Sequence, residues 1–138
     1  MPARPSKKLL RRQKPALRSQ PAIRIVMMPR DANYVGTIFG GIILNSIDLA
    51  GAIEAQRHTS HKVVTVAMKE VNFIAPVFIG DLVSFYTETI KVGTTSITVR
   101  VTVEARRAKP PHAAARVTQA RVVYVAIDEQ GKPTTLQS

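Results

Sequence analysis

The chain has 138 residues, which is the usual size of one domain and enough to bury a hydrophobic core. It contains no cysteine, which excludes a disulfide framework and a thiolate metal site. No apolar run approaches the roughly 20 residues that a membrane-spanning helix needs. The formal charge of +11 is uneven, because 9 of the 20 Lys and Arg residues lie in residues 1–30 and no acid occurs before Asp31.

Residues 1–22 have the composition of a basic extension rather than of a folded segment. Four prolines prevent a long helix, and apolar residues are too sparse to form a core. The same Arg-rich, acid-free composition is found in transit peptides, and it would suit weak binding to nucleic acid or an anionic surface. A solvated extension, or an arm that lies on a neighbour, is the simplest interpretation. We therefore expect one folded domain at residues 23–138, located in the cytoplasm.

The first half of this domain is expected to contain one strand and one helix. A short strand at Ile23–Pro29 ends at its proline, and turn-forming residues make 30–36 a loop. Gly40 and Gly41 then introduce a helix from about Gly41 to Arg57. This helix is apolar on nearly every side, which predicts that it is buried.

The second half is expected to contain four strands joined by short connections. These runs cover residues 62–76, 83–92, 96–106 and 116–131, with turns at 80–81 and 93–95 and a loop at 108–114. From Ser96 to Arg106, apolar and polar residues alternate with the period of a strand buried on one face. The order predicts an α+β fold in which a curved antiparallel sheet wraps around one long helix. We expect Tyr86, Val122 and Tyr124 on the outer face, as part of a surface for oligomerisation.

The stretch DANYVGTIFGGIILNSIDLAGA, from Asp31 to Ala52, combines two features that weaken a helix: two glycines at its start and one carboxylate among apolar residues. A helix N-terminus presents free N–H groups with partial positive charge, and glycine lets a substrate approach the backbone. Gly40 and Gly41 are therefore candidates for an oxyanion hole. Each feature also has a purely structural interpretation: a turn before the helix, and a local hydrogen bond for Asp48.

Asp48 lies about two helical turns beyond Gly41, or roughly 10–12 Å by the helical rise. This is too far for its carboxylate to reach a carbonyl bound at its own helix start. If two copies of the helix lie antiparallel in a dimer, Asp48 of one copy can face the helix start of the other. A carboxylate removed from water is a stronger base or nucleophile. The spacing therefore favours a site shared by two chains.

These residues follow a pattern that resembles the hotdog-fold acyl-CoA thioesterases, in particular the broad-specificity bacterial acyl-CoA hydrolases and the cytosolic hydrolases built from two tandem copies. The pattern is D-x-N-x-x-G-x-x-[FH]-G-G, then [M/I]-D-x-A-G, followed by VVTVAM, NFIAPVFIGD and VGTTSI. The similarity covers residues 23–134 and leaves out the basic tail. It implies a central helix wrapped by an antiparallel sheet, in homodimers that often assemble as a trimer of dimers, a hexamer.

The resemblance also implies roles for the residues of the site. Asn33 of one protomer would orient water or substrate, and Asp48 of the other would act as the base on water or as the nucleophile. The N–H groups of Gly40 and Gly41 would polarise the thioester carbonyl. Contacts to CoA are expected from Thr95, Ser96, Arg106 and Arg107.

Two positions depart from this pattern. Lys69 stands where many relatives have aspartate, and Thr94 stands where many have arginine. The second departure removes a cation for the CoA phosphates. A replacement would have to come from elsewhere, and the candidates are Lys91, Arg106, Arg107 and Lys109.

The function expected from this resemblance is hydrolysis of acyl-CoA to a free acid and CoA, without a metal or any other cofactor. His58 and His61 have the spacing of a weak metal pair, but no Cys or nearby acid completes a set. A non-enzymatic hotdog module that senses acyl-CoA is the alternative. Its basic tail would bind nucleic acid, although no helix-turn-helix pattern accompanies that tail. A hotdog hydratase is disfavoured because no His lies near Asp48 in the sequence.

Overall fold

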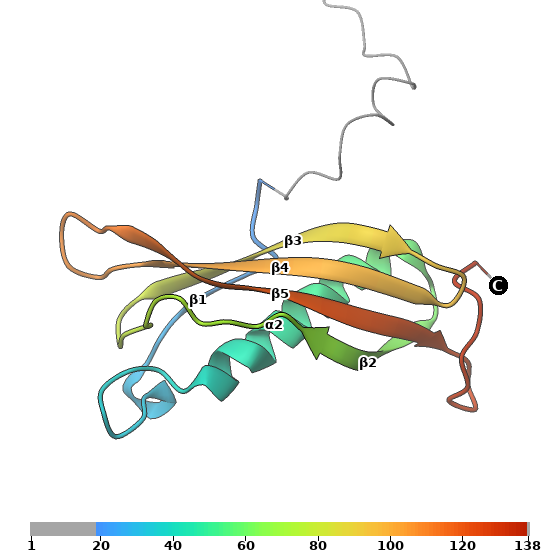
Figure 1. Cartoon of the computed structure of the whole chain (residues 1–138), viewed down its shortest axis with the longest axis horizontal. Helices are drawn as coiled ribbons and strands as arrows, with labels where there is room; N and C mark the ends of the chain where they lie inside the picture. Colours follow the sequence, from blue (N-terminus) through green and yellow to red (C-terminus); the bar gives the residue numbers. More distant parts are fainter. Residues whose placement is uncertain (1–18, 138) are drawn as a thin grey trace, which may run out of the picture.

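The computed structural model describes residues 19–137, in which a five-stranded antiparallel sheet lies over one long helix (Figure 1). The elements are β1 (Ile23–Val26), η1 (Pro29–Asp31), α2 (Gly40–Ala55), η2 (Gln56–His58), β2 (Lys62–Lys69), β3 (Leu82–Val92), β4 (Ser96–Arg106) and β5 (Ala114–Ile127). The strand order β1-β3-β4-β5-β2 makes β1 and β2 the edges of the sheet. The predicted α+β architecture is confirmed. Residues 1–18 lie outside the described part, so the domain boundary at residue 22 stays a prediction.

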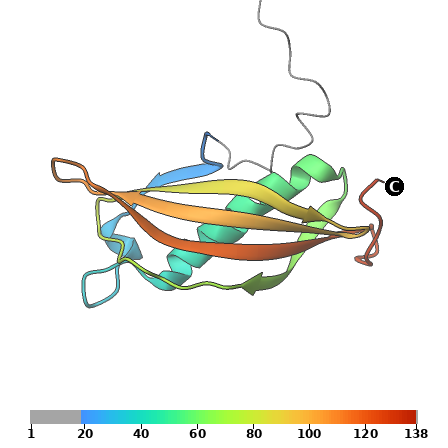
Figure 2. The same ribbon diagram turned by 45° about the horizontal axis from the view of Figure 1, so that its top comes forward.

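The sheet curls over α2, so that the helix lies in its concave face (Figure 2). The inward side chains of β4 are Ile97, Val99, Val101 and Val103, and all four are fully buried. Their neighbours Thr98 and Arg100 point to the other face and are partly exposed. The predicted alternation of this strand is therefore confirmed, and it forms the centre of the core.

The strand predicted over residues 62–76 is shorter in the structure. β2 ends at Lys69, and Glu70 has a φ of 60°, which breaks the extended conformation. Beyond it the chain keeps only isolated bonds to the sheet. The Ile74 N–H donates to the Val117 carbonyl at 2.8 Å. The segment from residue 70 to β3 is therefore a connection, not a strand.

The helix is buried on one side only. Ile43, Ile47 and Ala50 face the sheet and are buried, whereas Leu49 and Ile53 are 54% and 50% exposed. The prediction of burial on nearly every side is therefore wrong for the single chain, because the sheet covers one side of α2. The edge strand β2 also exposes apolar side chains, among them Val64 and Val66. An edge strand beside an exposed apolar helix face is an arrangement that invites pairing with another chain.

Two of the three residues predicted on the outer face of the sheet lie on the inner face instead. Val122 and Tyr124 are buried against α2, and Tyr124 is only 1% exposed. Tyr86 is partly exposed on β3. The prediction was wrong because β5 is apolar on both of its faces from residue 122 to residue 127, so alternation could not distinguish inside from outside.

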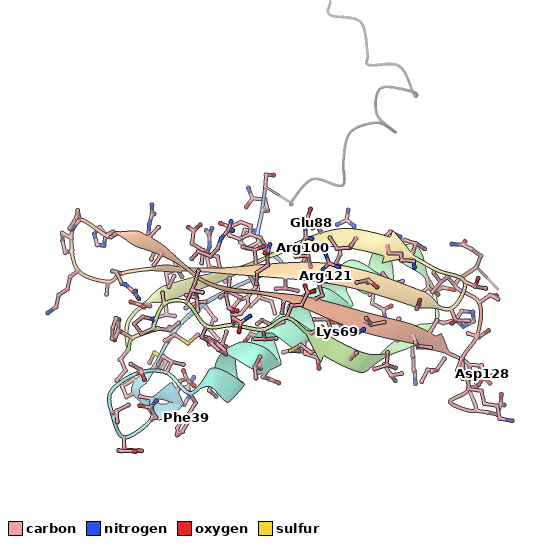
Figure 3. The ribbon with its side chains drawn as sticks, in the orientation of Figure 1. Phe39, Lys69, Glu88, Arg100, Arg121 and Asp128 are labelled. Carbon is pink, nitrogen blue, oxygen red and sulfur yellow. The ribbon has the colours of Figure 1, made fainter. Side chains whose placement is uncertain are left out.

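Charged side chains cross the middle of the sheet, and Figure 3 shows four of them on neighbouring strands: Glu88, Arg100, Arg121 and Lys69. Arg100 pairs with Glu88 at 2.9 Å, and Arg121 lies 3.3 Å from Glu70. These pairs are partly exposed, so they contribute little to stability. Within residues 19–137, no helix has the length and hydrophobicity required to cross a bilayer.

Candidate active site

The loop that leads into α2 is shaped by Asp31. Its carboxylate oxygen Oδ2 accepts a hydrogen bond from the Met28 N–H at 2.9 Å, which closes η1. Its backbone carbonyl accepts one from the Phe39 N–H at 3.0 Å, directly before the helix. Gly36, at the tip, has a φ of 94°, a conformation that favours glycine. The loop is thereby fixed at both ends while its tip projects outward.

Asn33 holds this loop together through its side chain. Oδ1 accepts hydrogen bonds from the Val35 N–H at 3.0 Å and the Thr37 N–H at 3.2 Å. Nδ2 donates to the Thr37 hydroxyl at 2.9 Å. An amide nitrogen carries two N–H groups, and the second has no acceptor among the described residues. Next to it, Tyr34 is fully exposed at the loop tip.

The start of α2 presents two free backbone donors. Phe39 and Ile42 donate to carbonyls within the segment, but the N–H groups of Gly40 and Gly41 donate to no acceptor among the described residues. A Cβ at Gly41 would meet nothing within 4 Å, and one at Gly40 would only touch the ring of Phe73 at 3.6 Å. The packing of the chain itself therefore does not require glycine at either position. Figure 3 shows that this helix start, marked by Phe39, and the turn at Asp128 lie at opposite ends of the molecule.

Asp48 lies on the side of α2 that faces β2 and β5. The Thr65 hydroxyl, on β2, donates to its Oδ1 at 2.6 Å. The Tyr124 hydroxyl, on β5, donates to its backbone carbonyl at 2.6 Å and lies 3.3 Å from Oδ1. Oδ2 has no partner among the described residues. Asp48 is partly exposed rather than buried as predicted, and one of its carboxylate oxygens is open to the exterior.

Thr65 was not singled out from the sequence, and Tyr124 was expected on the outer face of the sheet rather than beside Asp48. The two residues are direct partners across the β2–β5 ladder, and both side chains point at the helix. Their convergence depends on strand register, for which no local pattern exists. Burial, followed by the charge of Asp48 and the hydrogen bond to it, raises the pKa of Tyr124 well above its ordinary value. The phenol is therefore a neutral donor across the physiological range.

The helix start and Asp48 are as far apart in the structure as their spacing in the sequence predicts. Gly40 and Asp48 belong to one continuous helix, so the rise of 1.5 Å per residue separates them by ~12 Å. In a single chain the free donors at the helix start and the open carboxylate oxygen of Asp48 do not meet.

The four residues predicted to contact CoA are not brought together. Thr95 and Ser96 lie at the turn before β4, whereas Arg106 and Arg107 lie at the far end of this 11-residue strand. The separation is roughly 35 Å at 3.2–3.4 Å per residue, so one chain cannot offer all four to one ligand.

The Arg107 guanidinium has three partners within the chain. It pairs with the buried carboxylate of Asp81, donates to the Pro76 carbonyl at 3.1 Å and lies 4.8 Å above the ring of Phe78. It also borders a cleft of about 500 Å³ to which Lys109 contributes a second cation. Arg106 is exposed at the end of β4 and is not among the residues that line the cleft. The cleft end of β4 therefore keeps free cations, while Arg107 itself is committed to the fold.

Among residues 19–137, no group of three or more His, Cys, Asp or Glu side chains could hold a metal ion. His58 Nε2 lies 2.8 Å from the Thr89 hydroxyl, which in turn donates to the buried Glu54. His61 contributes to a different part of the surface, beside Asp128. His58 therefore has a structural role, and His61 lies at a different part of the surface.

Comparison with known proteins places the chain in a family. The model of the Thioesterase superfamily matches residues 35–109. The acyl-CoA thioester hydrolase YciA of Salmonella typhimurium is 38% identical over 83% of this chain and 87% of its own length. Cj0915, a hexameric hotdog fold thioesterase of Campylobacter jejuni, is 45% identical with a TM-score of 0.81, covering 86% of this chain and 90% of its own.

An acyl-CoA hydrolase from Staphylococcus aureus is also similar, and it was solved as alanine variants of one asparagine and of one aspartate. The asparagine variant, in complex with coenzyme A, is 27% identical with a TM-score of 0.76, and it covers 84% of this chain and 69% of that chain. The family model covers α2 and the strands β2, β3 and β4. The chain therefore belongs to the thioesterase superfamily and has its hotdog fold.

Proposed function

We propose that this chain is an acyl-CoA thioester hydrolase whose active site forms between two copies. Water adds to the thioester carbonyl carbon, the C–S bond breaks, and the products are a free carboxylic acid and CoA. The observation that carries this proposal is the separation on α2 of two unused groups: free N–H donors at its start and the open carboxylate oxygen of Asp48. Each group is incomplete alone, and an antiparallel partner helix would bring both together.

The N–H groups of Gly40 and Gly41 would hold the carbonyl oxygen as negative charge develops on it. Donors of this kind typically contribute about 3–4 kcal/mol each to the transition state. The absence of side chains at both positions, where the chain itself has room for them, is what a substrate lying against the backbone requires. The second N–H of the Asn33 side chain would be a further donor to the substrate or to water.

Asp48 of the partner copy would supply the reacting oxygen. Thr65 holds Oδ1 at 2.6 Å and so leaves Oδ2 to react. Oδ2 is the reactive atom whether the carboxylate deprotonates water or attacks the carbonyl itself. The asparagine and aspartate replaced in the S. aureus hydrolase are 15 residues apart, which is the separation of Asn33 and Asp48 in this chain. This agreement in spacing supports the assignment of the pair.

The exposed apolar surface supplies the means of pairing. Leu49 and Ile53 on α2, with Val64 and Val66 on β2, lie on either side of Asp48 and are half exposed. A second copy that covered this surface would also pair the free edge of β2 and desolvate the site. We propose a homodimer, assembled further into a hexamer like Cj0915.

Arg106 and Lys109 would contribute cations for the CoA phosphates, together with Thr95 and Ser96 of a different copy. We place the enzyme in the cytoplasm, without a cofactor.

The test is release of CoA thiol by Asp48→Asn. Since the chain has no cysteine, the thiol of CoA is the only one in the reaction. Asp48→Asn keeps the shape of the side chain and its bond from Thr65, and it should nearly abolish hydrolysis while the oligomer stays intact. The matched control is Asp128→Asn at the opposite end of the molecule, which keeps a turn-forming oxygen and should be fully active. Normal turnover by Asp48→Asn would refute the assignment.

A further inference from the structure

Tyr124 contacts the proposed reacting residue from the sheet side, through a hydrogen bond that the helix itself does not require. In an α-helix the carbonyl of residue 48 already accepts the N–H of residue 52. Its second lone pair accepts the Tyr124 hydroxyl at 2.6 Å, and the same hydroxyl lies 3.3 Å from Oδ1. One phenol thus touches both the backbone and the carboxylate of Asp48.

The helix contains a glycine at the position where this approach occurs. A Cβ on Gly51 would lie 2.2 Å from the Tyr124 hydroxyl oxygen, which is closer than real atoms stand, and 3.0 Å from two ring carbons, a tight contact that a shift of the ring by a few tenths of an ångström relieves. Gly51 is a helix-interior position, where glycine costs up to about 1 kcal/mol relative to alanine. This loss of helix stability is explained if the Tyr124 hydroxyl has to pass residue 51 in order to reach Asp48.

We infer that Tyr124 is a positioning residue for thioester hydrolysis. We also infer that residue 51 is glycine because a side chain there would collide with the Tyr124 hydroxyl. This inference rests on the proposed role of Asp48. The phenol fixes the backbone of residue 48 against the sheet while Thr65 fixes Oδ1, so that Oδ2 points in one direction. Thr65 and Tyr124 both reach Asp48 because the strand register places them opposite each other on β2 and β5. A reacting atom misplaced by about 1 Å can lose up to a hundredfold in rate.

Tyr124→Phe tests the hydroxyl without removing the buried ring. We expect kcat for a short-chain acyl-CoA to fall about tenfold or more with KM within twofold, because Tyr124 is buried behind Asp48 and does not itself touch the thioester. The matched control is Tyr86→Phe on the outer face of β3, which should leave kcat unchanged. Normal kcat in Tyr124→Phe would overturn the inference. A collapse of kcat, KM and melting temperature together would also overturn it, because it would show a structural role alone.

Gly51→Ala provides an independent test through coupling. Alone it should lower kcat, since its methyl group displaces the hydroxyl; in combination with Tyr124→Phe it should add little further loss. Fully additive losses would contradict the inference. The proposed function is tested separately by Asp48→Asn. If Asp48→Asn is active, Asp48 is not the reacting group. If Asp48→Asn is inactive and Tyr124→Phe is fully active, only the role of Tyr124 is refuted.

Discussion

Asn33 has two separable tasks, and a pair of substitutions distinguishes them. Asn33→Ala removes the whole amide. Asn33→Asp retains an oxygen that can accept the N–H groups of Val35 and Thr37, and its second oxygen can accept the Thr37 hydroxyl proton. What the aspartate lacks is the second N–H that we assign to the substrate. The alanine variant thus loses both the hydrogen bonds that hold the loop and the donor to the substrate, and the aspartate variant loses only the donor.

The structure sets the size of the expected effects. Alanine deletes three hydrogen bonds of 2.9–3.2 Å in a partly exposed loop. At a net value of about 0.5–1.5 kcal/mol each, reduced by water at the loop surface, their loss should destabilise the loop by roughly 1–3 kcal/mol. Aspartate should cost little stability. Loss of one preorganised donor to a developing oxyanion typically lowers turnover about 10²–10³-fold, and we expect this loss in both variants.

The assay combines steady-state thiol release with thermal unfolding of the same samples. We expect Asn33→Asp to unfold near the wild-type temperature and to be strongly impaired in kcat. Asn33→Ala should be impaired in kcat and also melt earlier. Turnover near the wild-type value in Asn33→Asp would refute the donor role and leave Asn33 as a residue that only shapes the loop.

Two further predictions concern parts of the chain outside the loop. Because the pKa of Tyr124 is raised from its ordinary value of 10.0, the unfolded chain ionises this phenol first, and the free energy of unfolding should fall as pH rises above about 10. Measured by urea unfolding between about pH 8 and 11, the free energy of unfolding should fall less in Tyr124→Phe than in the wild type, and as much as in the wild type in Tyr86→Phe. Equal pH dependence in Tyr124→Phe and the wild type would contradict the effect of burial on this phenol. Removal of residues 1–18 deletes 7 of the 20 Lys and Arg residues but keeps the bond from the Ala22 N–H to Phe85, so the oligomer and kcat should persist while binding to heparin weakens. Loss of the oligomer would show that this segment is an assembly arm.

The parts of the fold that sequence patterns predicted are those determined locally. β4 alternates apolar and polar residues and is buried on one face as expected, and Gly93 closes the turn before it by donating to the Ser96 carbonyl at 2.8 Å. The helix was expected from Gly41 to Arg57, and α2 runs from Gly40 to Ala55 with η2 continuing to His58. In each case the signal lies within a few residues of the structure that it determines.

The features that could not be placed correctly from the sequence depend on contacts between distant segments. β5 is apolar on both faces, so its sequence could not show that Tyr124 points inward; the pairing with β2 and the gap at Gly51 decide it. Thr65 reaches Asp48 for the same reason of register. The residues predicted to bind CoA were chosen by type and charge, and β4 separates them within one chain, so their contact with CoA stays a prediction. The resemblance to a family supplied Asn33 and Asp48, and the structure adds the partners that hold them.

If Asn33 and Asp48 serve one site from two chains, mixing two inactive variants should restore activity. Asn33→Ala and Asp48→Asn subunits, dissociated and reassembled at equal amounts, should form about half mixed dimers, each with one intact site. If each site draws on both chains, activity should recover to up to about one quarter of the wild-type value and rise with the measured fraction of mixed dimers. If mixed dimers are demonstrably present and activity stays at the level of the separate variants, the site lies within one chain and the shared site is refuted.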